Sequence, residues 1–377
     1  MNQKKTNILS AVEKILLLSI LFIVCIFLFS AMQTIKNVDN LSVSSFSVYD
    51  ILFIKVFFYG ILEILACIGY VIVSRKMRKN NQRTTLHKLG NKVKKRIPQT
   101  IVIVLTLALA IFVAVIYYDQ EMLMFYPTNS KESNTYLSKR DSYEKILITG
   151  KNGERYSGWL HKNEKSKKTI LYCGGNAQSS AATMRDYDMD KLWDNFFDYN
   201  FLMIDYPGYG ESEGKPSEKI IFSMVEQVYE YVKGNGALNE QIIIMGFSIG
   251  TEPAVYISSN YSVDGLILIA PYDEAKSLYN GYLNIFYGSL SSFIRNPFKS
   301  KEYAKQVETT PIIIASKDDE VIPYELSMNL SKSFKQTPTF ITIEGVQHNQ
   351  ILSDSKAIRE IQQYLTGIRQ NESVVNN

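Results

Sequence analysis

The chain contains few of the residues from which disulfide frameworks and metal sites are built. Its 377 residues include three cysteines and three histidines. Cys25, Cys67 and Cys173 lie far apart and match neither a metal-ligand spacing nor a disulfide framework. We find no internal repeat and no low-complexity tract. The cysteines therefore predict neither a metal site nor a disulfide framework.

Charge is distributed unevenly along the chain. The net charge is +4 overall, but residues 1–119 carry 15 Lys and Arg against 5 Asp and Glu, and residues 120–377 carry a net negative charge. The positive excess belongs to the N-terminal part alone. The composition therefore gives no support to a nucleic-acid partner.

Long apolar runs fill the first third of the chain. Ile8 to Met32, Ile51 to Val73 and Ile101 to Tyr118 each reach or approach the roughly 20 residues that a helix needs to cross a bilayer. The first run is too long for a signal peptide and is followed by two more. We predict a membrane domain over residues 1–119 with three transmembrane helices at about 8–32, 51–73 and 100–118. Lys55 and Glu63 interrupt the second.

The loop over residues 74–99 predicts the orientation in the membrane. It holds ten Lys or Arg residues and no acid. The positive-inside rule places this loop and the N-terminus in the cytoplasm. With three spans, everything after Tyr118 is extracytoplasmic. We predict an integral protein of the plasma membrane that contacts membrane lipids.

The rest of the chain alternates between strand-like and helix-like segments. A hairpin is predicted at Tyr143–Thr149 and Arg155–His161, after a polar loop over Ser130–Ser142. Short apolar or β-branched runs follow, separated by helix-like segments such as Ser217–Lys233 and Ser353–Leu365; these runs are Thr169–Cys173, Phe201–Ile204, Gln241–Met245, Gly265–Ile269, Pro311–Ala315 and Thr339–Ile343. This alternation predicts an α/β fold with a mostly parallel sheet, helices on both faces and an antiparallel start. Residues 368–377 are predicted to be a flexible tail.

One serine stands in a pattern typical of a nucleophile. The strand-like run ending at Met245 leads into Gly246-Phe247-Ser248-Ile249-Gly250, followed by a helix-like segment from Thr251. Gly-x-Ser-x-Gly at a strand-to-helix turn is the nucleophile-elbow pattern. The alternative is a chance occurrence of this pattern in an ordinary turn.

A serine nucleophile needs a base, and the base needs a carboxylate. Of the three histidines, His87 falls in the basic loop and His161 at the end of the hairpin, where a structural role is expected. His348 follows the last strand and is the predicted base. The carboxylate should come from Asp318, Asp319 or Glu320, which follow the preceding strand; their spacing alone does not decide among them.

The oxyanion of the transition state needs hydrogen-bond donors. One predicted donor is the backbone amide of Ile249. The other is the amide of Asn176, in the loop Gly174-Gly175-Asn176-Ala177 after the first parallel strand. An ordinary glycine turn would use the same residues.

These motifs together carry a resemblance. From about Tyr126 to Leu365 the chain resembles the α/β-hydrolase superfamily, and in particular its branch related to serine aminopeptidases and monoacylglycerol lipases. The oxyanion loop is similar to His-Gly-Asn-Ala, and Asp205 to Gly214 is similar to Asp-Tyr-Arg-Gly-Tyr-Gly-x-Ser-x-Gly. Asp319 to Pro323 resembles the acid loop of that branch, which favours Asp319 over Asp318. Gly345 to Asn349 resembles its base loop.

The resemblance implies an α/β-hydrolase domain over residues 120–367, with a short cap between Ala270 and Pro311. Gly174 and Pro207 depart from the histidine and arginine usual in the family, which leaves the geometry near the oxyanion site open. The aromatic residues of the cap could line an acyl-binding pocket, although packing within the cap is favoured; these residues are Tyr272, Tyr279, Tyr282, Phe286, Tyr287 and Phe293.

We therefore expect a membrane-anchored serine hydrolase that cleaves an ester, thioester or amide bond of a small-molecule or lipidic acyl substrate. Ser248, Asp319 and His348 are the expected catalytic residues, and this chemistry requires no metal or organic cofactor. Esterase or lipase activity is favoured over peptidase activity, because tethering concentrates lipidic substrates. The alternative is a membrane scaffold or signalling protein that binds a ligand or partner without turnover. The sequence identifies no protein partner.

Overall fold

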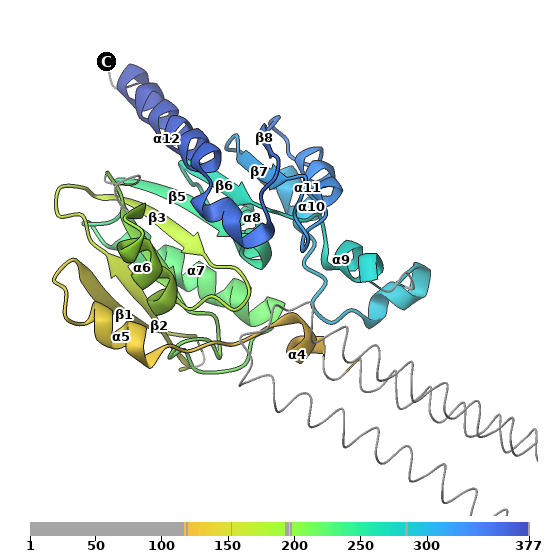
Figure 1. The fold of residues 1–377 in the computed structure, drawn as a ribbon, viewed down its shortest axis with the longest axis horizontal. Helices are drawn as coiled ribbons and strands as arrows, with labels where there is room; N and C mark the ends of the chain where they lie inside the picture. The colour runs from red at the N-terminus through yellow and green to blue at the C-terminus, as the bar shows by residue number, and fades with distance from the viewer. Residues whose placement is uncertain are drawn as a thin grey trace, which may run out of the picture. The chain divides into compact units, whose positions relative to one another are not determined.

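Figure 1 shows the computed structural model, which describes residue 117 and residues 120–375 except 152, 193–195, 197 and 283–285. The chain divides into two units, Met1–Val113 and Ala114–Asn377, and the described residues belong to the second. Apart from Tyr117, the three predicted transmembrane segments and the basic loop 74–99 lie outside the described residues. Within the described part, no helix combines the length and hydropathy needed to cross a bilayer.

One eight-stranded sheet organises the described unit (Figure 1). Its order is β1-β2-β4-β3-β5-β6-β7-β8. The strands are β1 (Tyr143–Thr149), β2 (Arg155–His161), β3 (Lys168–Cys173), β4 (Asn200–Ile204), β5 (Gln241–Phe247), β6 (Gly265–Ile269), β7 (Ile312–Ser316) and β8 (Thr339–Ile343). Strands β1, β2 and β4 pair antiparallel, and all other neighbours pair parallel. The predicted hairpin and mostly parallel sheet are confirmed.

The central strands form because their residues are apolar on both faces. Every residue of β4, β5, β6 and β7 is buried. Such runs have no polar face to turn toward water, so helices must cover both sides of the sheet. Strand β1 instead alternates between buried and exposed residues over much of its length, as expected of an edge strand with one face in water.

Helices supply this cover. Helix α6 packs against β2 and α12 against β6 to β8, while α7 and α8 pack on each other. Figure 1 shows α6 in front of the sheet and α7 behind it. The helices are α4 (Gln120–Met124), α5 (Lys131–Leu137), α6 (Ser180–Met189), α7 (Glu218–Gly234), α8 (Thr251–Asn260), α9 (Ala275–Tyr282), α10 (Ser300–Tyr303), α11 (Tyr324–Ser331) and α12 (Ser355–Val375), with 3₁₀ turns η3 (Ser248–Gly250), η4 (Gly288–Phe293), η5 (Ala304–Gln306) and η6 (His348–Ser353).

Two segments differ from the sequence-based prediction. The polar loop predicted over 130–142 contains α5. The Ser130 hydroxyl caps the N-terminus of this helix by accepting from the Ser133 amide, and Leu137 at its C-terminal end is buried in the core. Helix α12 extends to Val375, through most of the predicted flexible tail. Its apolar spacing continues from Ile361 and Leu365 to Ile368, which packs against the core.

The order of the strands gathers the predicted functional residues. Strands β3, β5, β6, β7 and β8 run parallel, so their carboxyl ends meet at one edge of the sheet. Asn176, Ser248, Asp319 and His348 all follow such an end within six residues. Ligands of open α/β sheets bind at this edge.

Candidate active site

Ser248 lies on a strained turn between β5 and α8. Its φ is +54°, in the left-handed region that residues other than glycine seldom adopt. The cost of such a conformation, about 1–3 kcal/mol, is typically tolerated at functional sites. The side chain is buried, and the Ser248 carbonyl accepts a hydrogen bond from the Thr251 hydroxyl at 2.6 Å. The sequence therefore folds locally as the elbow pattern predicts.

The two glycines of the elbow allow backbone segments to approach closely. A Cβ atom on Gly246 would lie 2.5 Å from the Gly250 carbonyl oxygen. A Cβ atom on Gly250 would overlap the carbonyl oxygens of Cys173 and Gly174 at the end of β3. Gly250 therefore brings the turn bearing Ser248 against the loop that contains Asn176.

We expect Gly250→Ala to destabilise the protein by about 1–3 kcal/mol or more, because the added methyl group has no space beside rigid backbone. Gly236→Ala is the matched control, since a Cβ atom there meets nothing within 4 Å. Thermal unfolding of the purified full-length chain in detergent measures both. Equal transition temperatures for the two variants would contradict the close approach at Gly250.

His348 and Asp319 form a hydrogen-bonded pair. His348 Nδ1 lies 2.7 Å from Asp319 Oδ2, and both side chains are buried. Asp319 Oδ1 accepts from the amides of Val321 and Ile322 at 2.8 and 2.7 Å. An ionised carboxylate only accepts, so it places the ring proton on Nδ1 and leaves Nε2 as an acceptor.

The two neighbouring acids hold the histidine loop. Asp318 Oδ2 accepts from the Gly345 amide at 2.6 Å, and Glu320 Oε2 accepts from the His348 amide at 3.0 Å. The three acids therefore bond different groups, and Asp319 is the one that bonds the imidazole ring. The sequence did not predict these roles for Asp318 and Glu320, because hydrogen bonds to backbone amides leave no mark in the residue pattern.

The imidazole ring also lies beside the elbow. The rings of His348 and Phe247 have centroids 4.8 Å apart, and Phe247 immediately precedes Ser248. Across the described residues, the structure records no hydrogen bond between the Ser248 hydroxyl and His348. Such bonds are often long in free enzymes and tighten around the substrate.

The loop after β3 is fastened by side chains. The Gly175 amide donates to Gln178 Oε1 at 2.7 Å and is therefore already engaged. Asn176 Oδ1 accepts from the Tyr126 amide and the Tyr209 hydroxyl at 2.9 and 2.7 Å. Asn176 Nδ2 donates to the Met124 carbonyl oxygen at 2.8 Å. The Asn176 side chain thus ties the segment before α5 to the candidate oxyanion loop, a role the sequence did not predict.

Comparison with known proteins agrees with this architecture. Residues 168–311 match the model of the alpha/beta hydrolase fold family. An esterase from Pyrococcus furiosus superposes with a TM-score of 0.51 at 18% identity, covering 64% of this chain and 98% of that chain. An alpha-beta hydrolase from Vibrio vulnificus superposes with a TM-score of 0.50 at 19% identity, covering 70% and 93%. The chain has the α/β-hydrolase fold.

The chain is also similar in sequence to curated proteins whose names include an alpha/beta hydrolase domain. Alpha/beta hydrolase domain-containing protein 17C of Xenopus tropicalis is 28% identical over 204 residues, which is 53% of this chain and 62% of the relative. Protein aho-3 of Caenorhabditis elegans is 31% identical over 156 residues, covering 40% of this chain and 44% of the relative. The match thus spans about three fifths or less of the length of these relatives.

Two other residues noted in the sequence, His161 and Asp205, make contacts outside the group formed by Ser248, Asp319 and His348. His161 lies at the end of β2, with its ring 5.0 Å from that of Tyr143, and burial lowers its pKa. Asp205 accepts from the amide and hydroxyl of Ser180 at 2.5 and 2.8 Å. Burial raises the pKa of its carboxyl to about 6, although these two hydrogen bonds act to lower it. Both are structural contacts, which agrees with the structural role expected for His161.

The segment predicted as a cap comprises α9, η4, α10 and η5. Tyr272 is buried, and the rings of Tyr279 and Phe286 lie 5.7 Å apart, which agrees with packing within the cap. Tyr287 and Phe293 are instead exposed. The acyl-pocket alternative for these aromatic residues stays a prediction.

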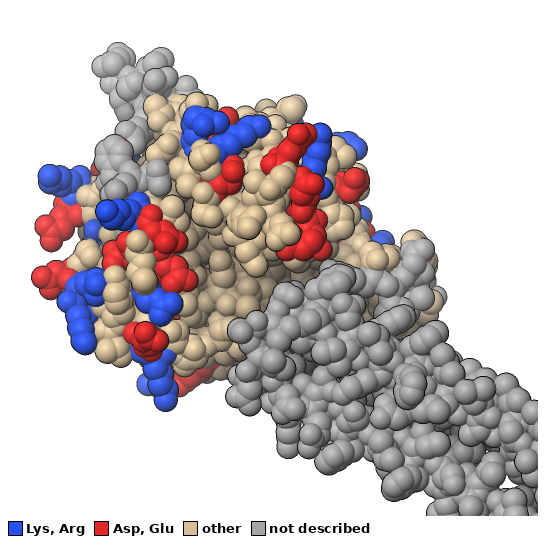
Figure 2. All heavy atoms as spheres, viewed as in Figure 1, with Lys and Arg blue, Asp and Glu red and all other residues tan. Residues whose placement is uncertain are grey.

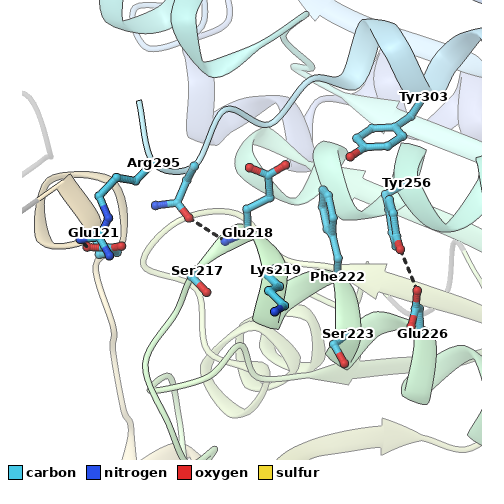
Figure 3. Close-up of a pocket in the computed structure, with 11 residues that line it drawn as sticks. Glu121, Ser217, Glu218, Lys219, Phe222, Ser223, Glu226, Tyr256, Arg295 and Tyr303 are labelled. Atoms are coloured by element: carbon cyan, nitrogen blue, oxygen red, sulfur yellow. Dashed lines mark hydrogen bonds and ion pairs between the residues drawn. The ribbon is translucent and has the colours of Figure 1, made fainter. Parts of the chain in front are cut away.

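A hollow of about 530 Å³ lies beside α7 (Figure 3). The stacked rings of Phe222 and Tyr256, with centroids 4.0 Å apart, line it together with Glu218 and Arg295. None of its lining residues belongs to the elbow, the acid loop or the histidine loop. It is therefore separate from the candidate active site.

Proposed function

We propose that the chain is a membrane-anchored serine hydrolase of the serine aminopeptidase and monoacylglycerol lipase-like branch. The observation that carries the proposal is the buried pair of Asp319 and His348 beside the strained Ser248 turn. A scaffold that only binds a ligand would have no need for an imidazole oriented by a carboxylate next to a strained serine.

The proposed reaction begins at Ser248. Its Oγ attacks the substrate carbonyl carbon while the hydroxyl proton passes to His348 Nε2. Asp319 keeps the ring proton on Nδ1 and stabilises the imidazolium that forms. The amides of Ile249 and Asn176 stabilise the developing oxyanion. His348 then returns the proton to the leaving group, which departs and leaves an acyl-enzyme that water hydrolyses by the same steps.

The proposed substrate is an acyl ester, with thioesters and amides as further candidates for the same chemistry. The Pyrococcus furiosus protein that superposes on this chain is an esterase, and the two share their fold. The three apolar runs before residue 119 would hold the domain at a bilayer, where lipidic esters are concentrated. We place the hydrolase domain on the extracytoplasmic side of the plasma membrane, following the basic loop 74–99. The chemistry uses no metal or organic cofactor.

Pre-steady-state hydrolysis tests the proposal. With excess p-nitrophenyl ester, the purified full-length chain should release a rapid burst of p-nitrophenol stoichiometric with active sites, followed by slower turnover, if deacylation limits the rate. A series of acyl chain lengths then defines the preferred substrate. Failure to turn over esters, thioesters and amides by a folded chain would contradict the proposal.

A further inference from the structure

The tip of the cap, residues 287–293, is apolar and exposed. Tyr287, Leu290 and Phe293 are 59%, 49% and 43% exposed. They are three of the five large hydrophobic residues exposed in the described part of the chain; the other two are Leu147 and Met189. Residues 286–294 include no charged residue. Three exposed apolar residues within seven positions, with no charge among them, favour an interaction surface over scattered exposure.

Hydrogen bonds fix this tip to the residues that precede α5. The Gln120 side chain is buried; its Nε2 donates to the Phe293 carbonyl oxygen at 2.6 Å, and its Oε1 accepts from the Arg295 amide at 2.9 Å. Arg295 also pairs with Glu121 at 2.9 Å (Figure 3). The Tyr117 ring packs edge-on against that of Phe293, with centroids 6.3 Å apart. The cap tip is therefore held at the start of α4.

The sequence just before α4 identifies what lies next to this tip. Gln120 follows the uncharged apolar run Ile101 to Tyr118 by two residues. Two residues span at most about 7 Å. The head-group region on each side of a bilayer is about 5–7 Å thick. If the run spans the bilayer, chain connectivity alone holds Gln120, and with it the Phe293 backbone, at the level of the lipid head groups.

We propose that the cap tip is a membrane-contact surface, in which Tyr287, Leu290 and Phe293 insert among the head groups of the bilayer that anchors the chain. Aromatic and aliphatic side chains without neighbouring charges suit this region. The contact holds the cap at the bilayer, and the expected consequence is that a lipidic substrate enters the site from the bilayer side. This inference rests on the membrane anchoring in the proposed function and deepens it.

Lipid quenching tests the contact without requiring activity. Leu290→Cys and the control Leu147→Cys are labelled with the fluorophore NBD in the full-length chain, with Cys25 and Cys67 replaced by alanine. Cys173 remains, because it is buried and burial raises its pKa to about 12, which keeps it unreactive. Vesicles of phosphatidylcholine and phosphatidylglycerol are prepared with and without spin-labelled phosphatidylcholine. We expect spin-labelled lipid to quench the label at position 290 and not that at position 147. Equal fluorescence of the position-290 label in both vesicles would overturn the proposal.

A reaction-rate comparison tests the consequence for substrate entry. In the same vesicles, Leu290→Asp should react about tenfold more slowly than the unsubstituted chain with a long-chain fluorophosphonate and at an unchanged rate with a short, water-soluble one. Leu147→Asp, equally polar and on the exposed side of β1, should leave both rates unchanged. Equal loss with both probes in Leu290→Asp would contradict delivery from the bilayer. If neither probe reacts with the unsubstituted chain, the hydrolase proposal fails, while the quenching result still decides the membrane contact.

Discussion

Substitution of Ser248 by alanine is expected to lower kcat for ester hydrolysis by a factor on the order of 10⁵ or more, because the attacking oxygen is lost. His348→Ala is expected to cause a loss of similar size, since the serine then has no base. Steady-state kinetics of the purified full-length variants with a p-nitrophenyl ester measure both.

The double variant provides the sharper result. Residues that act as one unit show non-additive losses, so Ser248→Ala combined with His348→Ala should be no slower than either single variant. Losses that multiply would mean that the two residues act independently. Near-normal hydrolysis by Ser248→Ala would mean that another group is the nucleophile.

The second large effect concerns the choice between two adjacent acids. Asp319→Asn is expected to lower kcat by about 10⁴-fold, because an amide in place of the carboxylate favours the wrong tautomer of His348. Asp318→Asn is the matched control at the neighbouring position. Its amide oxygen can still accept from the Gly345 amide, so we expect a change of less than about tenfold.

The same kinetic assay distinguishes the two variants, and circular dichroism verifies that each is folded. Equal losses at positions 318 and 319 would indicate that the acid loop acts through its overall charge or structure. A larger loss at Asp318 would contradict the assigned pairing of Asp319 with His348.

Much of the fold follows from the sequence because the strands are short, apolar and bounded by turns. Strands β1, β2, β6 and β8 have the bounds that the residue pattern predicts, and the others differ by one or two residues at an end. Because both faces of these short runs are buried, their backbone N–H and C=O groups form hydrogen bonds with neighbouring strands of the sheet. Helix α5 was missed because its stability comes from a cap at Ser130 and from tertiary contacts such as the 2.8 Å bond between Trp159 Nε1 and Asn134 Oδ1.

The candidate site was less predictable in its supporting contacts than in its central residues. Ser248 and His348 could be selected because few residue types perform their chemistry and because each follows the end of a parallel strand. The pattern could not separate Asp318 from Asp319 without the family resemblance, since adjacent residues share the same loop. The contacts of Asn176 with Met124, Tyr126 and Tyr209 join segments far apart in sequence, which local patterns do not report.

The sequence was also insufficient to predict which residues of the cap are exposed. Its aromatic residues could be counted from the sequence, but not divided into the buried Tyr272 and the exposed Tyr287 and Phe293. The backbone on both sides of Ile294 is hydrogen-bonded to the Gln120 side chain, a contact that the local sequence does not indicate. The cap tip is thus placed by a polar residue outside the cap.

Reaction with a fluorophosphonate, followed by mass mapping of the modified peptide, tests the central claim most directly. Membranes carrying the unsubstituted chain, Ser248→Ala or His348→Ala are treated side by side, because the probe reacts only with an activated serine. We predict one adduct on Ser248 of the unsubstituted chain and none on either variant. No adduct on the correctly folded unsubstituted chain, or an adduct that persists in Ser248→Ala, would contradict the serine-hydrolase assignment.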